Sequence, residues 1–113
     1  TFAVPSDALT ATAVAVKASA GKVYLVYAQS PAASTVGSFL MVYNTAAASV
    51  TAGTTAPRHC FFVPAATSLA VPIHTAGTAD AFGTAISVAS ATTFNGATGP
   101  AAADRLQVAV LYS

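Results

Sequence analysis

The run Phe39-Leu40-Met41-Val42-Tyr43-Asn44 decides the fold, because it is apolar on both faces of an extended strand. Successive side chains of a strand point to opposite faces, so the odd-numbered residues share one face and the even-numbered residues the other. A strand with one face in water alternates apolar and polar residues, and this run does not. The strand is therefore either central and covered on both faces, or its outer face meets another subunit.

Further short strands follow on both sides of this run. Residues 22–29 and 57–63 are also apolar on both faces, whereas residues 12–18, 67–73, 82–90 and 106–112 alternate between two faces. Gly, Pro and small polar residues separate these segments, and no long segment carries an apolar stripe at helical spacing. The spacing predicts an all-β protein, a single antiparallel β-sandwich of about seven to eight strands, for which a jelly roll is one arrangement.

The turn at Ser19-Ala20-Gly21 predicts that residues 12–18 and 22–29 pair as a hairpin. Residues 44–56, 75–81 and 91–104 are rich in small residues and are predicted loops.

The length of the chain, 113 residues, fits one domain with one core. Residues 1–10 contain Pro5 and show no clear period, so we expect an N-terminal arm or an edge segment there. Residues 11–113 are expected to form the β-sandwich domain.

Charge is scarce in this sequence. Charged residues make up 6% of the chain, the net charge is +1, and hydrophobic residues make up 55%. Ordinary soluble domains carry roughly 25% charged residues. We therefore expect much of the surface to be covered in the working state, either by copies of the chain or by a larger assembly.

The same composition argues against two classes of partner. The four basic residues are spread along the chain, which argues against a nucleic-acid-binding surface. No uninterrupted apolar run of about 18 residues occurs, so no membrane span is predicted.

The richest candidate for a metal site is the set Met41, His59, Cys60 and His74, whose side chains are the ligand types of a blue-copper centre. The order of these residues argues against copper, because neighbouring residues on a strand leave by opposite faces, and His59 and Cys60 are neighbours. A Cys60–His dyad would need a third, orienting group that the sequence does not indicate. The simpler interpretation is a buried, unreactive Cys60.

The carboxylates, Asp7, Asp80 and Asp104, all fall in segments without a predicted strand, where Asp commonly caps turns. A hydrolase with paired carboxylates has no positive support from their positions. The sequence therefore predicts no enzyme, no catalytic residue, no cofactor and no metal.

Several segments together resemble small virion proteins of tailed bacteriophages. The resemblance lies in the order and spacing of Ala15-Val16-Lys17-Ala18-Ser19-Ala20-Gly21-Lys22-Val23-Tyr24, Phe39-Leu40-Met41-Val42-Tyr43-Asn44, Val50-Thr51-Ala52-Gly53-Thr54-Thr55-Ala56-Pro57, Phe62-Val63-Pro64-Ala65 and Val108-Ala109-Val110-Leu111-Tyr112. This group looks like β-sandwich capsid decoration (cement) proteins or other accessory head or tail components. The resemblance implies a structural role in the virion and brings no catalytic residues with it.

These observations favour one function for the protein and leave two alternatives open. We expect a decoration protein that binds the outer head surface of a tailed phage, as a homo-oligomer (a trimer) in contact with the major capsid protein. The alternatives are a tail or fibre component and a carbohydrate-binding β-sandwich module. The candidate contact residues come from the arm, from outer strand faces and from a loop tip: Phe2, Val4, Val26, Leu40, Val42 and Phe94.

Overall fold

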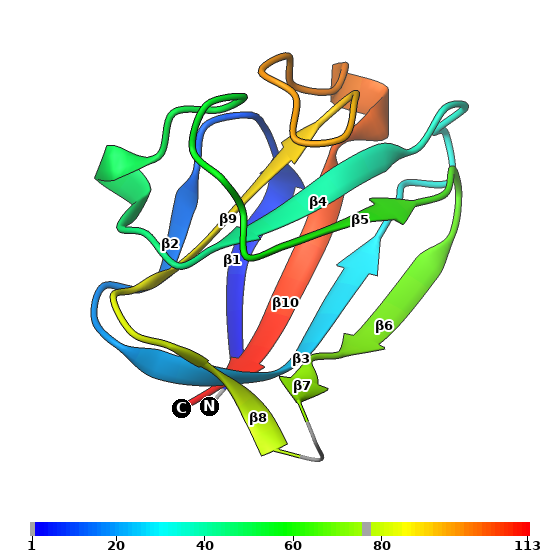
Figure 1. The fold of residues 1–113 in the computed structure, drawn as a ribbon. Coiled ribbons are helices and arrows are strands. Elements are labelled where there is room, and N and C mark those ends of the chain that lie inside the picture. Colours follow the sequence, from blue (N-terminus) through cyan, green and yellow to red (C-terminus); the bar gives the residue numbers. More distant parts are fainter. Residues whose placement is uncertain (1, 76–77) are drawn as a thin grey trace.

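The computed structural model describes the backbone of residues 2–75 and 78–113 and the side chains of residues 8–73 and 79–113. This part of the chain forms two antiparallel sheets packed face to face (Figure 1), which confirms the predicted β-sandwich. Short 3-10 turns, η1 (Ala47–Ser49) and η2 (Ala102–Asp104), are the helical segments found there, and no helix is long and apolar enough to cross a bilayer. The strands are β1 (Phe2–Leu9), β2 (Val14–Lys17), β3 (Gly21–Gln29), β4 (Ser38–Tyr43), β5 (His59–Val63), β6 (Ser68–Pro72), β7 (His74–Thr75), β8 (Thr78–Phe82), β9 (Ile86–Ala91) and β10 (Leu106–Tyr112).

The strand order is that of a jelly roll. Sheet A runs β1-β10-β3, with β6 and β8 both pairing with β3 and β7 lying beyond β8. Sheet B runs β2-β9-β4-β5. With the β7–β8 hairpin set aside, the chain visits the sheets in the order A, B, A, B, B, A, B, A, which is the connectivity of a double-sheet jelly roll.

The predicted hairpin between residues 12–18 and 22–29 is wrong. β2 pairs with β9 in sheet B, whereas β3 pairs with β10 in sheet A, so the segment between them is a corner that carries the chain from one sheet to the other. A Cβ added to Gly21 would lie 2.5 Å from the Ser113 carbonyl oxygen and 2.9 Å from the Lys17 Cδ. Glycine is therefore needed at this corner for a close approach of backbones.

Two segments without a predicted strand also pair. Residues 1–10 supply β1, an edge strand whose register with β10 runs from Phe2↔Leu111 to Leu9↔Leu106. The predicted loop at residues 75–81 contains most of β8, and the predicted strand at residues 82–90 starts only at Ile86. Strand propensity is weak in both segments, and pairing with β10 and β3 decides their structure.

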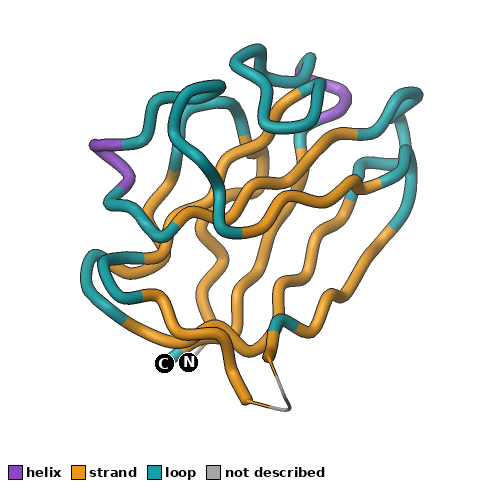
Figure 2. The backbone as a smooth tube through the Cα atoms, viewed as in Figure 1, coloured by secondary structure: helices purple, strands orange, loops and turns teal. Residues whose placement is uncertain are grey.

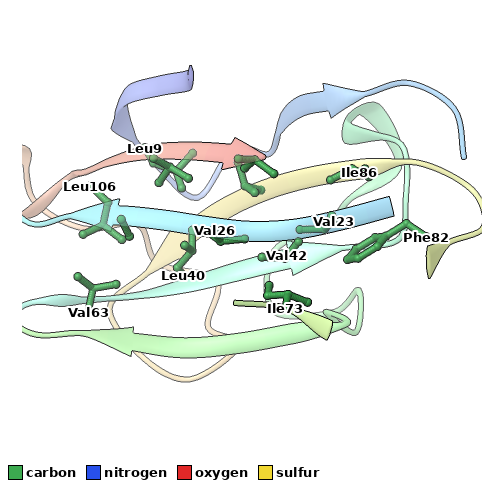
Figure 3. Packing of buried hydrophobic residues seen from close by; sticks show 14 residues of the cluster. Leu9, Val23, Val26, Leu40, Val42, Val63, Ile73, Phe82, Ile86 and Leu106 are labelled. Atoms are coloured by element: carbon green, nitrogen blue, oxygen red, sulfur yellow. The ribbon is translucent and has the colours of Figure 1, made fainter. Parts of the chain in front are cut away.

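The main core lies between the two sheets, and Figure 3 shows its side chains from both sheets interdigitating. On β3 the buried residues are Val23, Val26 and Ala28 rather than one strictly alternating set. The register with β10 shifts between Leu111 and Tyr112, and one extra residue on β3 moves the pattern by one position. Because of this bulge Val23 does not share a face with Leu25 and Tyr27, although strict alternation along the strand would put them together.

A second apolar cluster lies on the outer face of sheet B. Met41 and Tyr43 of β4 are fully buried there, and Val50 packs against them. The cover comes from the chain's own loops, which gather on this side of the molecule (Figure 2). β4 lies between β9 and β5. The sequence left two explanations for a strand that is apolar on both faces: a central, doubly covered strand, or contact with another subunit. The structure shows the first, because β4 is central and covered on both faces.

Candidate binding surfaces

The outer face of sheet A carries three cross-strand rows of uncharged side chains, which we call the sheet A face. Because Val26, Ala28, Val108 and Val110 point into the core, the alternate residues of β3 and β10 point outward. The registers of β3 with β6 and β10 define the rows: Pro72–Leu25–Leu111, Ala70–Tyr27–Ala109 and Ser68–Gln29–Gln107.

Within the described residues, no strand or helical turn packs across the sheet A face. Ala70 and Pro72 are exposed, and Leu25 and Tyr27 are half-buried against their neighbours. A sheet face in water normally carries polar and charged residues at the outward positions. Here the rows Pro72–Leu25–Leu111 and Ala70–Tyr27–Ala109 are apolar. The sheet A face is therefore a candidate protein-binding surface.

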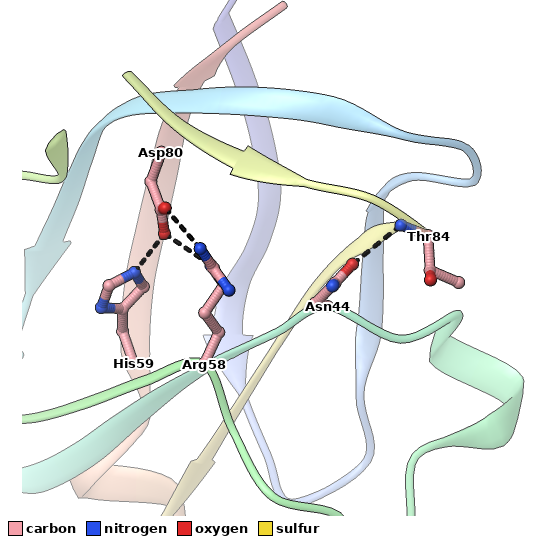
Figure 4. A network of polar contacts seen from close by, with 5 residues as sticks. All are labelled: Asn44, Arg58, His59, Asp80 and Thr84. Carbon is pink, nitrogen blue, oxygen red and sulfur yellow. Dashed lines mark hydrogen bonds and ion pairs between the residues drawn. The ribbon is translucent and has the colours of Figure 1, made fainter. Parts of the chain in front are cut away.

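A compact polar cluster joins the two sheets (Figure 4). The Arg58 guanidinium donates from Nε and from one terminal nitrogen to the Asp80 carboxylate, both at 2.7 Å, and His59 Nε2 lies 2.6 Å from Asp80 Oδ2. The Asp80 side chain is 6% exposed and the Arg58 side chain 41%. Arg58 also lies over the Phe82 ring, 5.4 Å from its centroid. Since Asp80 belongs to β8 and His59 to β5, one carboxylate links sheet A to sheet B.

The charges of this cluster stabilise one another. Hydrogen bonding to Arg58 is the main cause that lowers the pKa of Asp80 to about 2, despite burial, and the contact with His59 adds to it. Bidentate Arg–carboxylate pairs are among the stronger ionic contacts in proteins. A His–Asp pair can orient a base for a nucleophile; the interactions shown for the His59 ring are with the Asp80 carboxylate and the Phe82 ring. The arrangement links the two sheets through one carboxylate.

Met41 and Cys60 are cross-strand partners on the outer face of sheet B. Neighbouring strand residues point to opposite faces, so His59 leaves by the other face and binds Asp80. The side chain of His74 lies outside the described residues. Among those described, no group of three His, Cys, Asp or Glu side chains is placed to hold a metal ion.

Burial raises the pKa of the Cys60 thiol, and the backbone N–H of Asn95 partly opposes that shift. The pKa of Tyr43 is raised chiefly by burial, and also by the nearby Cys60. A thiol with a raised pKa is a poor nucleophile at neutral pH. Cys60 is half-buried rather than fully buried, so the burial expected from the sequence is only partly met, and its low reactivity stays a prediction.

Asp104 organises the loop before β4. Its carboxylate accepts hydrogen bonds from Ser34 Oγ at 2.6 Å and from the Thr35 backbone N–H at 3.2 Å. Ser38 Oγ in turn donates to the Asp104 carbonyl oxygen at 2.8 Å. The hydrogen bond from Ser34 is the first cause that lowers the pKa of Asp104. Asp104 thus stabilises a turn, as the sequence predicts for it, whereas Asp80 lies in a strand.

Three phenylalanines gather on the outer side of sheet B, near the end of β5. The ring centroids of Phe39 and Phe62 lie 5.1 Å apart at an interplanar angle of 56°, and those of Phe39 and Phe94 lie 6.0 Å apart at 86°. Phe94 is 68% exposed. The rings are tilted and edge-on to one another, so they do not share one flat face of the kind that stacks on a sugar ring. Phe94 remains a contact candidate.

The other candidate contact residues do not lie on a described surface of the molecule. Val26, Leu40 and Val42 are fully buried between the sheets, so the expectation that they contact a partner is wrong. Leu40 and Val42 lie on the inner face of β4, because the odd-numbered residues of that strand form its outer face. Val26 lies on the inner face of β3. An aspartate at Val26 or Leu40 would put a charge in the core and would test stability rather than assembly. The side chains of Phe2 and Val4 lie outside the described residues, although the backbone register puts Phe2 opposite Leu111.

Sequence reasoning missed the cluster of Arg58, His59 and Asp80. A usable signal was present, since Arg58 and His59 are adjacent and the chain has only three acidic residues to balance its bases. The partner could not be chosen without knowing that Asp80 of β8 lies beside Arg58 and His59.

No protein-family model, no curated protein and no solved structure matches this chain.

Proposed function

We propose that this chain is a structural subunit of a virus particle, and specifically a decoration protein that binds the outer head surface of a tailed bacteriophage. On this proposal its function is binding, in which copies of the chain contact neighbouring shell subunits. No residue performs a reaction. The site is the sheet A face.

The observation that carries the proposal is the uncharged character of the sheet A face. Its rows combine Leu25, Tyr27 and Leu111 with exposed Ala70 and Pro72. Apolar residues at the centre with Ser and Gln at one side match the apolar core and polar rim of protein interfaces. The low charge of the whole chain, 6%, supports the same interpretation, because a free subunit usually relies on surface charge for solubility.

The segments that resemble virion proteins are mostly structural elements in this fold. They include the β2–β3 corner, the strand β4 and the C-terminal part of β10. The resemblance is therefore what suggests a virion, whereas the sheet A face supports only the binding part of the proposal.

Mass spectrometry of purified particles tests the proposal directly. We expect peptides of this chain in separated phage heads, in a stoichiometry that follows the number of shell subunits. Peptides confined to separated tails would favour the tail or fibre alternative. Their absence from particles would contradict both.

Two matched alanine substitutions test the surface. Ala70 is exposed on the sheet A face, and Ala48 is exposed on the turn η1, on the other side of the molecule. In co-sedimentation with heads that lack the protein, we expect Ala70→Glu to weaken binding by roughly tenfold or more, because the charge would be buried without a partner. Ala48→Glu should leave binding unchanged. Equal binding by both variants would exclude the sheet A face.

A further inference from the structure

The edges of the two sheets differ in how they are protected against pairing with another chain. An edge strand presents unpaired N–H and C=O groups, and natural proteins shield them with bulges, charges, prolines or very short strands. β1 contains Pro5 and shifts register twice against β10. β2 is four residues long, shifts register against β9 and carries Lys17. β6 ends in Pro72, and β7 has two residues.

β5 carries none of these features. It pairs with β4 through an unbroken register from Ser38↔Val63 to Val42↔His59. Its sequence, His-Cys-Phe-Phe-Val, contains no proline, lysine or acidic residue. Within the described residues, the backbone of β5 makes no hydrogen bond outside sheet B. One side of this strand is therefore a regular row of unpaired donors and acceptors.

Apolar side chains flank the free side of β5 on both faces. On the outer face, Phe62 is 44% exposed and packs against Phe39. On the inner face, Phe61 is only partly buried against the core, as are Leu69 and Val71 of the neighbouring edge strand β6. A strand added beside β5 would shield these groups as well as its backbone.

We propose that a second copy of the chain pairs with this one through β5, so that two copies of sheet B form one continuous antiparallel sheet. β5 is the one described edge without a protecting feature, so the matching edge on a second copy is its own β5. Contact between identical patches closes as a two-fold dimer and does not propagate. A five-residue strand with a few flanking side chains makes a small interface, so a reversible dimer is expected.

This dimer is independent of the proposed function, because it uses an edge of sheet B and leaves the sheet A face free. It differs from the trimer expected from the sequence. Its test needs no virus particle, so failure of the dimer and failure of head binding would be seen in separate experiments.

Sedimentation velocity of the full chain from about 1 to 100 µM tests the proposal, with Phe62→Lys as the disrupting variant. A lysine on an edge strand disfavours strand addition. We expect the wild-type mass to rise from monomer to dimer and the dissociation constant of Phe62→Lys to be roughly tenfold higher or more. Tyr24 is 42% exposed on the other sheet, so Tyr24→Lys is the matched control and should dimerise like the wild type.

Hydrogen exchange of the wild-type chain tests the pairing through β5 even if Phe62→Lys fails to fold. The amides of residues 59–63 on the free side should exchange more slowly at the higher concentration, while those of β1 should not change. A wild-type monomer at all concentrations, a trimer, or exchange in residues 59–63 that does not depend on concentration would overturn the proposal.

Discussion

Asp80 shows how much a single side chain can contribute when charge is scarce. Its carboxylate binds Arg58, just before β5, and His59, the first residue of β5, and is itself almost fully buried in β8. A link of this kind between two sheets is not available from the apolar core alone, because core contacts are not directional. The carboxylate therefore fixes the position of β8 against the edge of sheet B.

Replacing Asp80 with Asn should lower the free energy of unfolding at pH 7 by about 2 kcal/mol, because the carboxyl pKa falls from 3.8 to about 2 on folding. A lowered pKa in the folded state gives stability that is present above the unfolded pKa and is lost as the pH falls through the folded value. Urea unfolding at several pH values measures this. The wild type should lose the difference between pH values of about 4 and 2, and the two proteins should converge below that range.

Asp104 also contributes to the acid sensitivity of both proteins, since its pKa is lowered by Ser34. The informative quantity is therefore the difference between wild type and Asp80→Asn at each pH. A difference that stays constant from neutral pH to the acid limit would contradict the assignment to Asp80.

Cys60 gives the second prediction at this scale. Burial raises the pKa of its thiol, and the loop that contains Asn95 lies against it. We expect a thiol reagent to label the native chain at neutral pH more slowly than the chain unfolded in denaturant. Rates followed by mass spectrometry check this. Equal rates in the two states would show an accessible thiolate and would reopen the possibility of a nucleophile.

At the scale of elements, the corner between β2 and β3 is a tightly constrained connection. A Cβ on Gly21 would meet the Ser113 carbonyl oxygen at 2.5 Å, and backbone cannot move aside as a flexible side chain can. Gly83 follows β8 and has nothing within 4 Å of the corresponding position. Gly21 and Gly83 are therefore a matched pair of positions for an alanine substitution, one crowded and one open.

Gly21→Ala should destabilise the fold by roughly 1 to 3 kcal/mol, through displacement of the chain end from β3. Gly83→Ala should change stability by less than about 0.5 kcal/mol. Urea denaturation of both variants at neutral pH gives the comparison. If Gly21→Ala is as stable as Gly83→Ala, the close approach at the corner is not needed for folding.

For the whole molecule, the pairing of the two ends of the chain is the main feature. β1 and β10 are neighbours in sheet A, and Leu9 and Leu106 are register partners that are both fully buried. An arm could be removed without loss of the domain, whereas an edge strand that covers core residues could not.

Removal of residues 1–9 should therefore abolish cooperative unfolding of the remaining chain. Without β1, one edge of β10 and the core beside Leu106 and Val108 would be open to water. Circular dichroism with thermal melting, and the dispersion of amide signals in NMR spectra, would detect the loss. A truncated chain that melts cooperatively at the wild-type temperature would show that residues 1–9 act as an arm after all.

The sequence by itself determined the fold class and much of the core. Alternation with a period of two is a local property, so the inward sets Leu69, Val71 and Ile73, and Leu106, Val108 and Val110, could be predicted residue by residue. The same local logic identified Phe94 as an exposed loop tip, and it placed Cys60 in an apolar strand, where the residue is half-buried. Both follow from composition and position along the chain.

Only the tertiary structure decided which strands pair and what covers each face. A hairpin and a corner between sheets have the same local pattern, so β2 and β3 could not be assigned to separate sheets. A single bulge in β3 moved Val26 to the core, and the chain's own loops were found to cover the outer face of β4, which decided between the two alternatives left open for that strand. The free edge of β5 and the partner of Asp80 depend on contacts between distant segments, and local pattern carries no information about distance in space.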